Sequence, residues 1–240
     1  MRIGRLMTAF LLIILFSIAG AGQSLNDTIN RLDGEGRKQG YWKKHDDSGM
    51  ILYEGHFNAD VPAGEFKYYY PDGKTKAISV FSKNGRYSAT TTYHYSGKIM
   101  SEGYYADKLK DSLWKYYDIN GIFLKEEFYR NNQKNGAWRS YYQDGQVAEE
   151  IHWKDDMKDG PWVQYYFDGT KKLEGSYLND EQQGPISHYF PSGRARITGA
   201  YDQSYRTGTW YYMNDSSQVI KIEHYEKGKL VEEESFDPEK

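Results

Sequence analysis

The acidic side chains of this sequence include one row whose spacing could serve chemistry. Its members lie at multiples of 24 residues from one another: Glu54, Glu102, Glu126, Glu150 and Glu174. Aligned carboxylates can act as general acids and bases. If the chain folds as β-hairpins, however, Lys43, Lys115 and Arg139 lie directly across from three of them. We therefore interpret the row as cross-strand ion pairs worth a few tenths to ~1 kcal/mol each.

Three of the six histidines, His56, His152 and His224, share another position of the same spacing. Imidazole is a common metal ligand. On a β-sheet, however, His56 and His152 would lie roughly 38 Å apart, whereas zinc ligands lie ~2 Å from the ion. Residues 118–127 (DINGIFLKEE) partly match a calcium loop, but Tyr116 holds the first ligand position, which indicates turn chemistry. We expect no metal and no other cofactor.

The sequence also lacks the motifs of common enzyme classes. It contains no cysteine, no glycine-rich phosphate loop, no His-Glu-x-x-His and no serine nucleophile elbow. We therefore expect no catalytic residues and no enzymatic activity. Its 31 basic and 34 acidic residues give a net charge of −3, which argues against nucleic acid as a partner.

The spacing of 24 residues extends over eight repeats with no insertion or deletion. One column carries the structural aromatic residues and reads Trp42, Phe66, Thr90, Trp114, Trp138, Trp162, Ile186 and Trp210. A second is wholly aromatic and reads Phe57, Phe81, Tyr105, Tyr129, Trp153, Tyr177, Tyr201 and Tyr225. A third holds the turn glycines Gly49, Gly73, Gly97, Gly121, Gly145, Gly169 and Gly193, with Ser217 in the last repeat. A fourth, the tyrosine row, comprises Tyr69, Tyr93, Tyr117, Tyr141, Tyr165 and Tyr189.

Within a repeat, two runs of aromatic and β-branched residues flank an Asp-Gly pair such as Asp144 and Gly145. This pattern predicts a β-hairpin with a two-residue type I′ turn. No 3.6-residue apolar stripe supports a helix. In the predicted register Trp138 lies opposite Ile151 and Arg139 lies opposite Glu150, whereas a three-residue loop would shift that register.

Alternation along the strands then sorts the side chains into two faces. One face, here named the tryptophan face, collects Trp138, Tyr142, Val147, Ile151 and Trp153. The other, the tyrosine face, collects Arg139, Tyr141, Glu150 and His152. The tryptophan face is predicted to be buried, with small residues opposite its large ones: Gly55, Ser79, Gly103, Gly175 and Gly199. The tyrosine row is predicted to be the stripe that faces a partner.

These features predict an all-β fold, an elongated and twisted single antiparallel sheet of eight tandem 24-residue hairpins. About sixteen strands would extend roughly 75 Å at ~4.8 Å per strand. A closed barrel or a propeller is the alternative, although propeller blades need ~40 residues or more each.

The ends of the chain differ from the repeats, which occupy residues 38–231. Residues 1–22 carry Arg2 and Arg5, an apolar run at 9–18 and small residues after it, as signal peptides do. Cleavage near residues 21–23 would export the protein to the periplasm or the medium. Residues 23–37 form a polar lead-in and residues 232–240 a charged tail, both expected to protect the edges of the sheet.

The repeated Gly-x-Trp-x-x-Tyr-Tyr-x-x-Gly, followed by Glu-x-x-Tyr, resembles the variant MORN (membrane occupation and recognition nexus) repeat of bacterial proteins, including YwqK-type antitoxins. The resemblance covers about residues 38–231. It departs at five positions, which are Ser88, Thr90, Ser112, Ile186 and Ser217. It implies tandem antiparallel hairpins, a role in protein or membrane-surface interaction, and no catalytic residues.

Together these patterns indicate a non-enzymatic, exported scaffold that binds another protein through an extended sheet face. Three alternatives remain open from the sequence. Regularly spaced rings could bind cell-surface glycan, the family resemblance suggests a membrane surface, and the antitoxin relatives suggest neutralisation of a secreted toxin.

Overall fold

A computed structural model describes residues 29–237, so the expected signal peptide lies outside the described residues. Within that range the chain forms twenty strands and no helix. The first strands of the eight hairpins are β2 (Lys38–His45), β4 (Val61–Tyr69), β6 (Tyr87–Tyr93), β8 (Leu109–Tyr117), β11 (Gly136–Tyr141), β13 (Met157–Tyr165), β16 (Gly184–Tyr189) and β18 (Tyr205–Met213). The second strands are β3 (Ile51–Asn58), β5 (Thr75–Ser82), β7 (Ile99–Ala106), β9 (Phe123–Arg130), β12 (Val147–Lys154), β14 (Lys171–Leu178), β17 (Ala195–Asp202) and β19 (Val219–Glu226).

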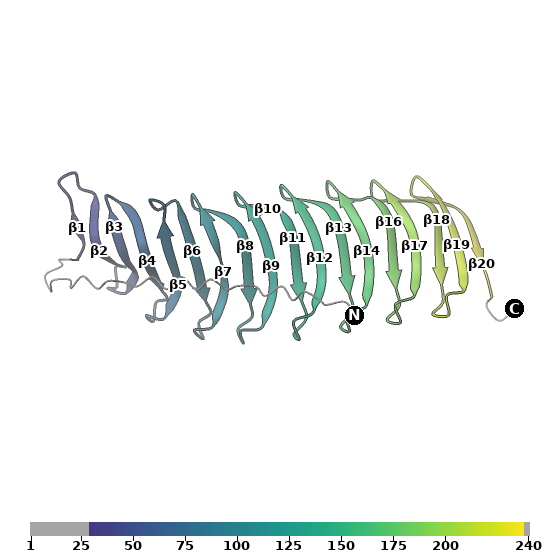
Figure 1. Ribbon diagram of the computed structural model, residues 1–240, viewed down its shortest axis with the longest axis horizontal. Helices are drawn as coiled ribbons and strands as arrows, with labels where there is room; N and C mark the ends of the chain where they lie inside the picture. The colour runs from purple at the N-terminus through teal and green to yellow at the C-terminus, as the bar shows by residue number, and fades with distance from the viewer. Residues whose placement is uncertain (1–28, 238–240) are drawn as a thin grey trace, which may run out of the picture.

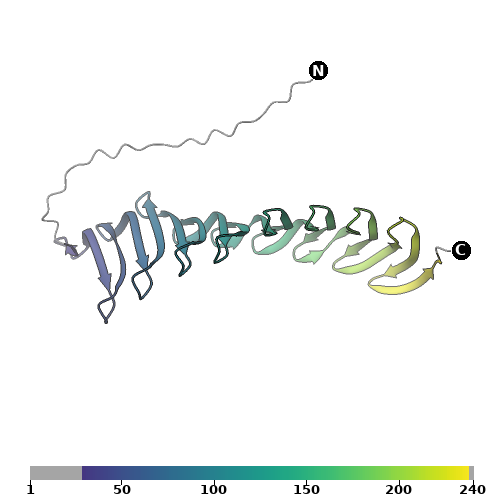
Figure 2. The same cartoon turned by 90° about the horizontal axis from the view of Figure 1, so that it is seen from below.

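Four further strands complete a single antiparallel sheet: β1 (Arg31–Leu32), β10 (Gln133–Lys134), β15 (Glu181–Gln182) and β20 (Lys229–Ser235). Strands β10 and β15 are short pieces that a bulge separates from β11 and β16, and β1 and β20 flank the repeats. Strands consecutive in sequence lie side by side, and β1 and β20 lie at opposite ends of the ribbon (Figure 1). Seen from below, the hairpins follow one another along the long axis (Figure 2). The expected open sheet of tandem hairpins is confirmed.

The predicted register holds, although the predicted turn is wrong. Trp138 pairs with Ile151 and Arg139 with Glu150. The loop has three residues, because Tyr142 N–H donates to the Gln146 carbonyl while Gly145 N–H donates to Tyr142. Gly145 has φ 87° but Asp144 does not have the positive φ that a type I′ turn needs. A bulge before Tyr141 then restores the register.

This loop also corrects the predicted placement of Val147. Val147 pairs with Tyr141 rather than Tyr142, so it lies on the tyrosine face. In the hairpin before, the corresponding Phe123 packs its ring against Tyr117 and Tyr141, at centroid distances of 5.4 and 4.6 Å. The type I′ geometry instead occurs in the connections between hairpins. The φ values are 50° and 70° at Asp155 and Asp156, for example.

The core lies on the tryptophan face and is built between neighbouring hairpins. Phe66, Trp114 and Trp210 are almost fully buried, with 2%, 2% and 1% of their surface exposed. Each ring covers a glycine at the paired position of the hairpin before it: Gly55, Gly103 and Gly199 respectively. Trp138 and Trp162 have Glu127 and Ile151 at that position, and both stay half-buried. The sequence correctly placed small residues beneath the rings, but the closest ring belongs to the next hairpin along the chain.

Aromatic contacts continue this core along the ribbon. The ring of Phe66 lies 5.0 Å from Phe57 and 5.1 Å from Phe81, and both contacts are edge-to-face. Trp138 similarly lies 5.3 Å from both Tyr129 and Trp153. Such pairs add ~0.5–1.5 kcal/mol beyond their buried area. Since one hairpin cannot bury its own face, the aromatic columns make the folding of each hairpin depend on its neighbours.

The third repeat departs from the others in backbone as well as sequence. In most repeats a glycine with positive φ, such as Gly160, makes a bulge where one hairpin meets the next. Ser88 replaces this glycine, and β5 pairs with β6 without any register shift. Ser112 keeps a positive φ of 60° and the bulge remains. The junction of β5 and β6 therefore lacks the local bend and added twist that a bulge introduces.

The two ends of the sheet differ in how their outer edges are protected. Asn30 covers the outer edge of β2, because its side chain accepts the Lys43 N–H at 2.8 Å and donates to the Lys43 carbonyl at 3.0 Å. This contact and β1 lie within the polar lead-in. At the other end β20 runs to Ser235, so residues 232–235 of the charged tail form part of a strand. Three consecutive glutamates on this last strand discourage association with another sheet.

Candidate functional site

The tyrosine row connects each hairpin to the one before it. Four of its hydroxyls donate to glutamates of the preceding hairpin: Tyr69 to Glu54 at 2.5 Å, Tyr117 to Glu102 at 2.8 Å, Tyr141 to Glu126 at 2.9 Å, and Tyr189 to Glu174. Tyr93 lacks this bond because Ile78 occupies the corresponding glutamate position. All six rings are half-buried. Four of the six rings are thus held in place by hydroxyl groups that donate to carboxylates.

These contacts shift the pKa values of Glu54 and of tyrosines in the row. Hydrogen bonds from Tyr41 and Tyr69 lower the pKa of Glu54 to about 2. Burial, together with the bond to Glu102, raises the pKa of Tyr117 to about 12. Burial and Glu126 raise that of Tyr141 to about 12 as well. At neutral pH Glu54 is therefore an ionised carboxylate, which is a strong acceptor for the neutral phenol of Tyr69.

Basic residues form ion pairs with the glutamates of the row largely as expected. Lys43 contacts Glu54 at 3.2 Å, and the Arg139 Nε contacts Glu150 at 2.5 Å. Lys115 pairs with Glu126 in the backbone register, yet its ammonium group lies 3.8 Å from Glu102 instead. The glutamates thus have structural partners in the same face of the sheet.

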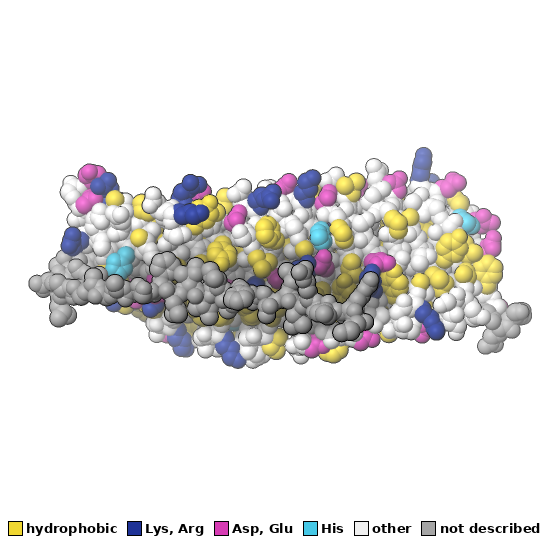
Figure 3. Space-filling model, in the orientation of Figure 1, with side chains coloured by type: hydrophobic (Ala, Val, Ile, Leu, Met, Phe, Trp, Pro, Cys, Tyr) yellow, Lys and Arg dark blue, Asp and Glu magenta, His cyan; other side chains and the backbone are white. Residues whose placement is uncertain are grey.

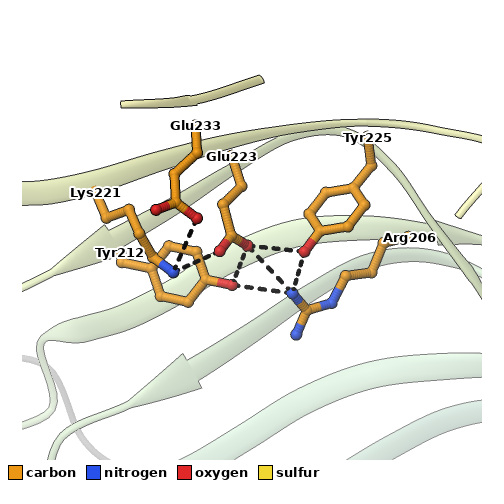
Figure 4. Close-up of polar contacts among 6 residues, drawn as sticks. All are labelled: Arg206, Tyr212, Lys221, Glu223, Tyr225 and Glu233. Atoms are coloured by element: carbon orange, nitrogen blue, oxygen red, sulfur yellow. Dashed lines mark hydrogen bonds and ion pairs between the residues drawn. The ribbon is translucent and has the colours of Figure 1, made fainter. Parts of the chain in front are cut away.

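Two buried carboxylate clusters on the tryptophan face were not predicted. Glu223 is 5% exposed and accepts hydrogen bonds from Tyr212, Tyr225 at 3.0 Å, Arg206 at 3.2 Å and Lys221 (Figure 4). Burial alone would raise the pKa of Glu223, but the bonds from Lys221 and the two tyrosines hold the pKa below its ordinary value. The carboxylate is therefore ionised and saturated with donors.

The second cluster surrounds Glu127, four repeats earlier. Glu127 is 4% exposed and accepts from Lys125 at 2.7 Å and Tyr129 at 2.9 Å. Lys110 lies 4.6 Å from the Trp114 ring, as Arg206 lies 4.3 Å from the Trp210 ring. Corresponding members of the two clusters are 96 residues apart: Lys110 and Arg206, Tyr116 and Tyr212, Lys125 and Lys221, Glu127 and Glu223, Tyr129 and Tyr225. That recurrence was the available signal in the sequence.

Neither cluster has the geometry of an active site. Each carboxylate is buried beneath its own donors, so no substrate can reach it, and the donors come from the two strands of the same hairpin, β18 and β19 for Glu223 and β8 and β9 for Glu127. Fully satisfied polar networks of this kind fix one arrangement of the surrounding side chains. We assign both clusters to the packing of the two strands within one hairpin.

The histidine column has separate structural partners along the sheet. His152 Nε2 lies 3.0 Å from Glu150, and His224 Nδ1 lies 3.0 Å from the Thr209 hydroxyl. Asp118, in the segment that resembles a calcium loop, accepts the backbone N–H groups of Asn120 and Ile122 at 2.8 Å each. In residues 29–237 no group of three or more His, Asp or Glu side chains is placed to hold a metal ion.

The turn glycines all adopt the left-handed conformation, with φ between 83° and 87°. Ser217 takes the same role with φ 65°. This conformation strains residues that carry a Cβ, which explains why glycine recurs there.

Across the described strands and turns, no helix is present that is long and apolar enough to span a membrane.

Comparisons with known proteins match this repeat geometry to a family. The MORN repeat variant matches four segments, residues 63–84, 89–107, 134–155 and 158–179. No curated protein matches the chain. Among solved structures, a chain of "Crystal Structure of TcdB2-TccC3-Cdc42" is 11% identical over 80% of this chain, with a TM-score of 0.19. The match covers only 13% of that longer chain.

A porin-like protein from Bacteroides uniformis ATCC 8492 is 8% identical, over 81% of this chain and 86% of its own, with a TM-score of 0.19. TM-scores this low do not indicate a shared overall fold. The strand pairing of the four segments matched to the family recurs in the other hairpins. This chain therefore carries MORN-variant repeats, in four matched segments between residues 63 and 179.

Proposed function

We propose that this protein is a non-enzymatic, exported scaffold that binds a protein partner along the tyrosine face of its sheet. The observation that supports it most is the tyrosine row itself. Its rings repeat along the ribbon, and glutamates of the preceding hairpin fix four of its hydroxyls. A partner that contacts fixed aromatic rings loses little conformational entropy on binding.

The two faces differ in what they offer a partner. On the tryptophan face Trp114 and Trp210 are already covered, at 2% and 1% exposed, and Trp138 and Trp162 are half-buried. The tyrosine face instead combines half-buried rings with ion pairs such as Lys67 with Glu65 at 3.3 Å. Aromatic rings rimmed by polar groups are typical of protein interfaces. In Figure 3 hydrophobic side chains lie along the middle of one face, and charged side chains lie near both long edges.

Export is proposed from residues 1–22 of the sequence. A basic start, a short apolar run and small residues after it are the features of a signal peptide. Cell fractionation followed by sequencing of the mature N-terminus tests this part alone. We expect the protein in the periplasm or medium with a new terminus near residues 21–23. A cytoplasmic protein that retains Met1 would refute export.

Site-specific photo-crosslinking in the native compartment tests the binding face. Lys67 lies on the tyrosine face and Lys44 on the tryptophan face, opposite Tyr53. We would replace each in turn with p-benzoylphenylalanine. Lys67→p-benzoylphenylalanine should crosslink one defined protein, and Lys44→p-benzoylphenylalanine should give little of that product. A defined product from Lys44 alone, or none from either position, would contradict the proposal.

A further inference from the structure

A hollow on the tyrosine face lies at the third repeat, where β5 and β6 pair without a bulge. It has a volume of about 450 Å³, within the range of small-molecule sites. Its lining comes from β6, β7 and β8, namely Ala89, Thr90, Thr91, Glu102, Gly103, Tyr104, Leu113 and Lys115. The hollow exists because Ala89 and Thr91 are short at positions where other repeats carry Tyr41, Lys43 or Arg139.

Tyr104 at this hollow has no structural role that its side chain could serve. The side chain is 55% exposed. Among the described residues its hydroxyl has no hydrogen-bond partner and its ring stacks on no other ring. The corresponding His152 and His224 are each bonded to a neighbour. The cross-strand partners of Tyr104 are Ala89 and Asp111, and its hydroxyl bonds to neither of them.

Apolar surface extends from Tyr104 across the neighbouring strands. Val80, which pairs with Ala89, is 47% exposed. Ala89 itself is exposed between them. The face of the Tyr104 ring therefore borders a shallow apolar floor, as a platform for a flat ligand ring would.

The two charged residues that line the hollow, Glu102 and Lys115, cancel in charge. The Lys115 ammonium lies 3.8 Å from Glu102, and the two side chains are 42% and 39% exposed. Glu102 also accepts from Tyr117 through Oε1, which leaves Oε2 free to accept from a ligand. The Thr91 hydroxyl has no partner among the described residues. Together they offer a donor, an acceptor and a hydroxyl with no net charge.

We propose that this hollow binds a neutral glycan, with one sugar ring stacked on Tyr104 and its hydroxyls bonded to Glu102, Lys115 and Thr91. A charged ligand would gain little electrostatic binding energy, because the charges of Glu102 and Lys115 compensate each other. A protein partner requires ~800 Å² of surface on each side, whereas this hollow accommodates a single ring. The site is independent of the proposed protein partner, because its test uses purified protein and sugar alone.

Titration calorimetry of the purified chain with cellohexaose, chitohexaose and laminarihexaose tests the site. We expect saturable binding of at least one of them. Tyr104→Ala should weaken that binding about tenfold, since stacking on the ring is lost. The matched control is Tyr211→Ala, because Tyr211 is 41% exposed on the same face of the last repeat and should not affect binding.

A second variant keeps the test independent of the tyrosine. Ala89→Phe leaves Tyr104 in place but fills the hollow, and phenylalanine suits an exposed strand position. It should abolish binding while circular dichroism stays unchanged. The proposal is overturned if none of the three oligosaccharides binds, or if Tyr104→Ala and Ala89→Phe both bind as the parent does.

Discussion

Replacing Gly199 with alanine would place a methyl group inside the volume of the Trp210 ring. An added Cβ would lie 2.3 Å from Cδ2 of that ring, and a Cβ at Gly103 would lie 2.3 Å from Cδ2 of Trp114. Real Cβ contacts are never so short, and both rings are nearly fully buried. The indoles would have to shift away from the sheet and lose their packing.

Gly175 provides a matched control in the same column. A Cβ there would meet the Ile186 side chain at 3.4 Å, which is ordinary van der Waals contact. None of the three glycines has a positive φ, so alanine fits the backbone at each. Each substitution also restricts the unfolded chain, a gain of ~0.4–1 kcal/mol that the three share. A difference in stability between the three variants therefore reports on the side chain that covers each glycine.

Overpacking of this kind lowers the free energy of unfolding by ~1–3 kcal/mol. For a chain of this size each kcal/mol corresponds to roughly 2–4 °C in melting temperature. Urea unfolding followed by near-ultraviolet dichroism would measure the loss. Hydrogen exchange of β17 and β18 would localise it, because repeat proteins can unfold in parts. Equal losses at Gly175 and Gly199, or no loss at Gly103 and Gly199, would refute the reasoning.

Three further experiments test other contacts. Trp210→Ala should lower the free energy of unfolding by ~3–5 kcal/mol and Trp162→Ala by less in urea melts, since only the first ring is fully buried; equal losses would contradict this. Glu54 has a pKa of about 2 in the fold against an ordinary 4.5, so its stabilisation is present above pH 4.5 and is lost toward pH 2. In acid titrations followed by dichroism, Glu54→Gln should flatten that loss; an unchanged slope would count against the tyrosine bonds. Asp180 has φ 68° and accepts the Lys158 N–H at 2.8 Å. In thermal melts Asp180→Gly should lose only that bond, ~0.5–1.5 kcal/mol, whereas Asp180→Ala should lose more through backbone strain; the reverse order would refute this.

Sequence alone predicted the sheet and most of its register. Unbroken 24-residue spacing located the hairpins, and alternation placed Trp138 opposite Ile151. Turn geometry was harder, because an Asp-Gly pair suits both a type I′ turn and a three-residue loop with a left-handed glycine. The hairpin has the three-residue loop, and a bulge beside it keeps the predicted register. Among the residues that the sequence assigned to a face, only Val147 lies on the other face.

Contacts between hairpins were less accessible to sequence reasoning. Which ring covers Gly55 depends on how successive hairpins stack, and the ring is that of Phe66 in the next hairpin.

The buried carboxylates were also missed from the sequence. Glu127 and Glu223 interrupt a column of mostly small residues, so a local pattern does not reveal their role. Only the recurrence of their tyrosine and basic partners four repeats later would have indicated it.

Hydroxyl-radical footprinting with mass spectrometry tests most directly whether neighbouring hairpins close the tryptophan face and leave the tyrosine face open. The account predicts strong protection of Trp114 and Trp210, intermediate labelling of Trp138 and Trp162, and rapid labelling of Tyr104. If Trp114 and Trp210 label as fast as Trp138 and Trp162, the hairpins do not stack as one closed face and the account is wrong.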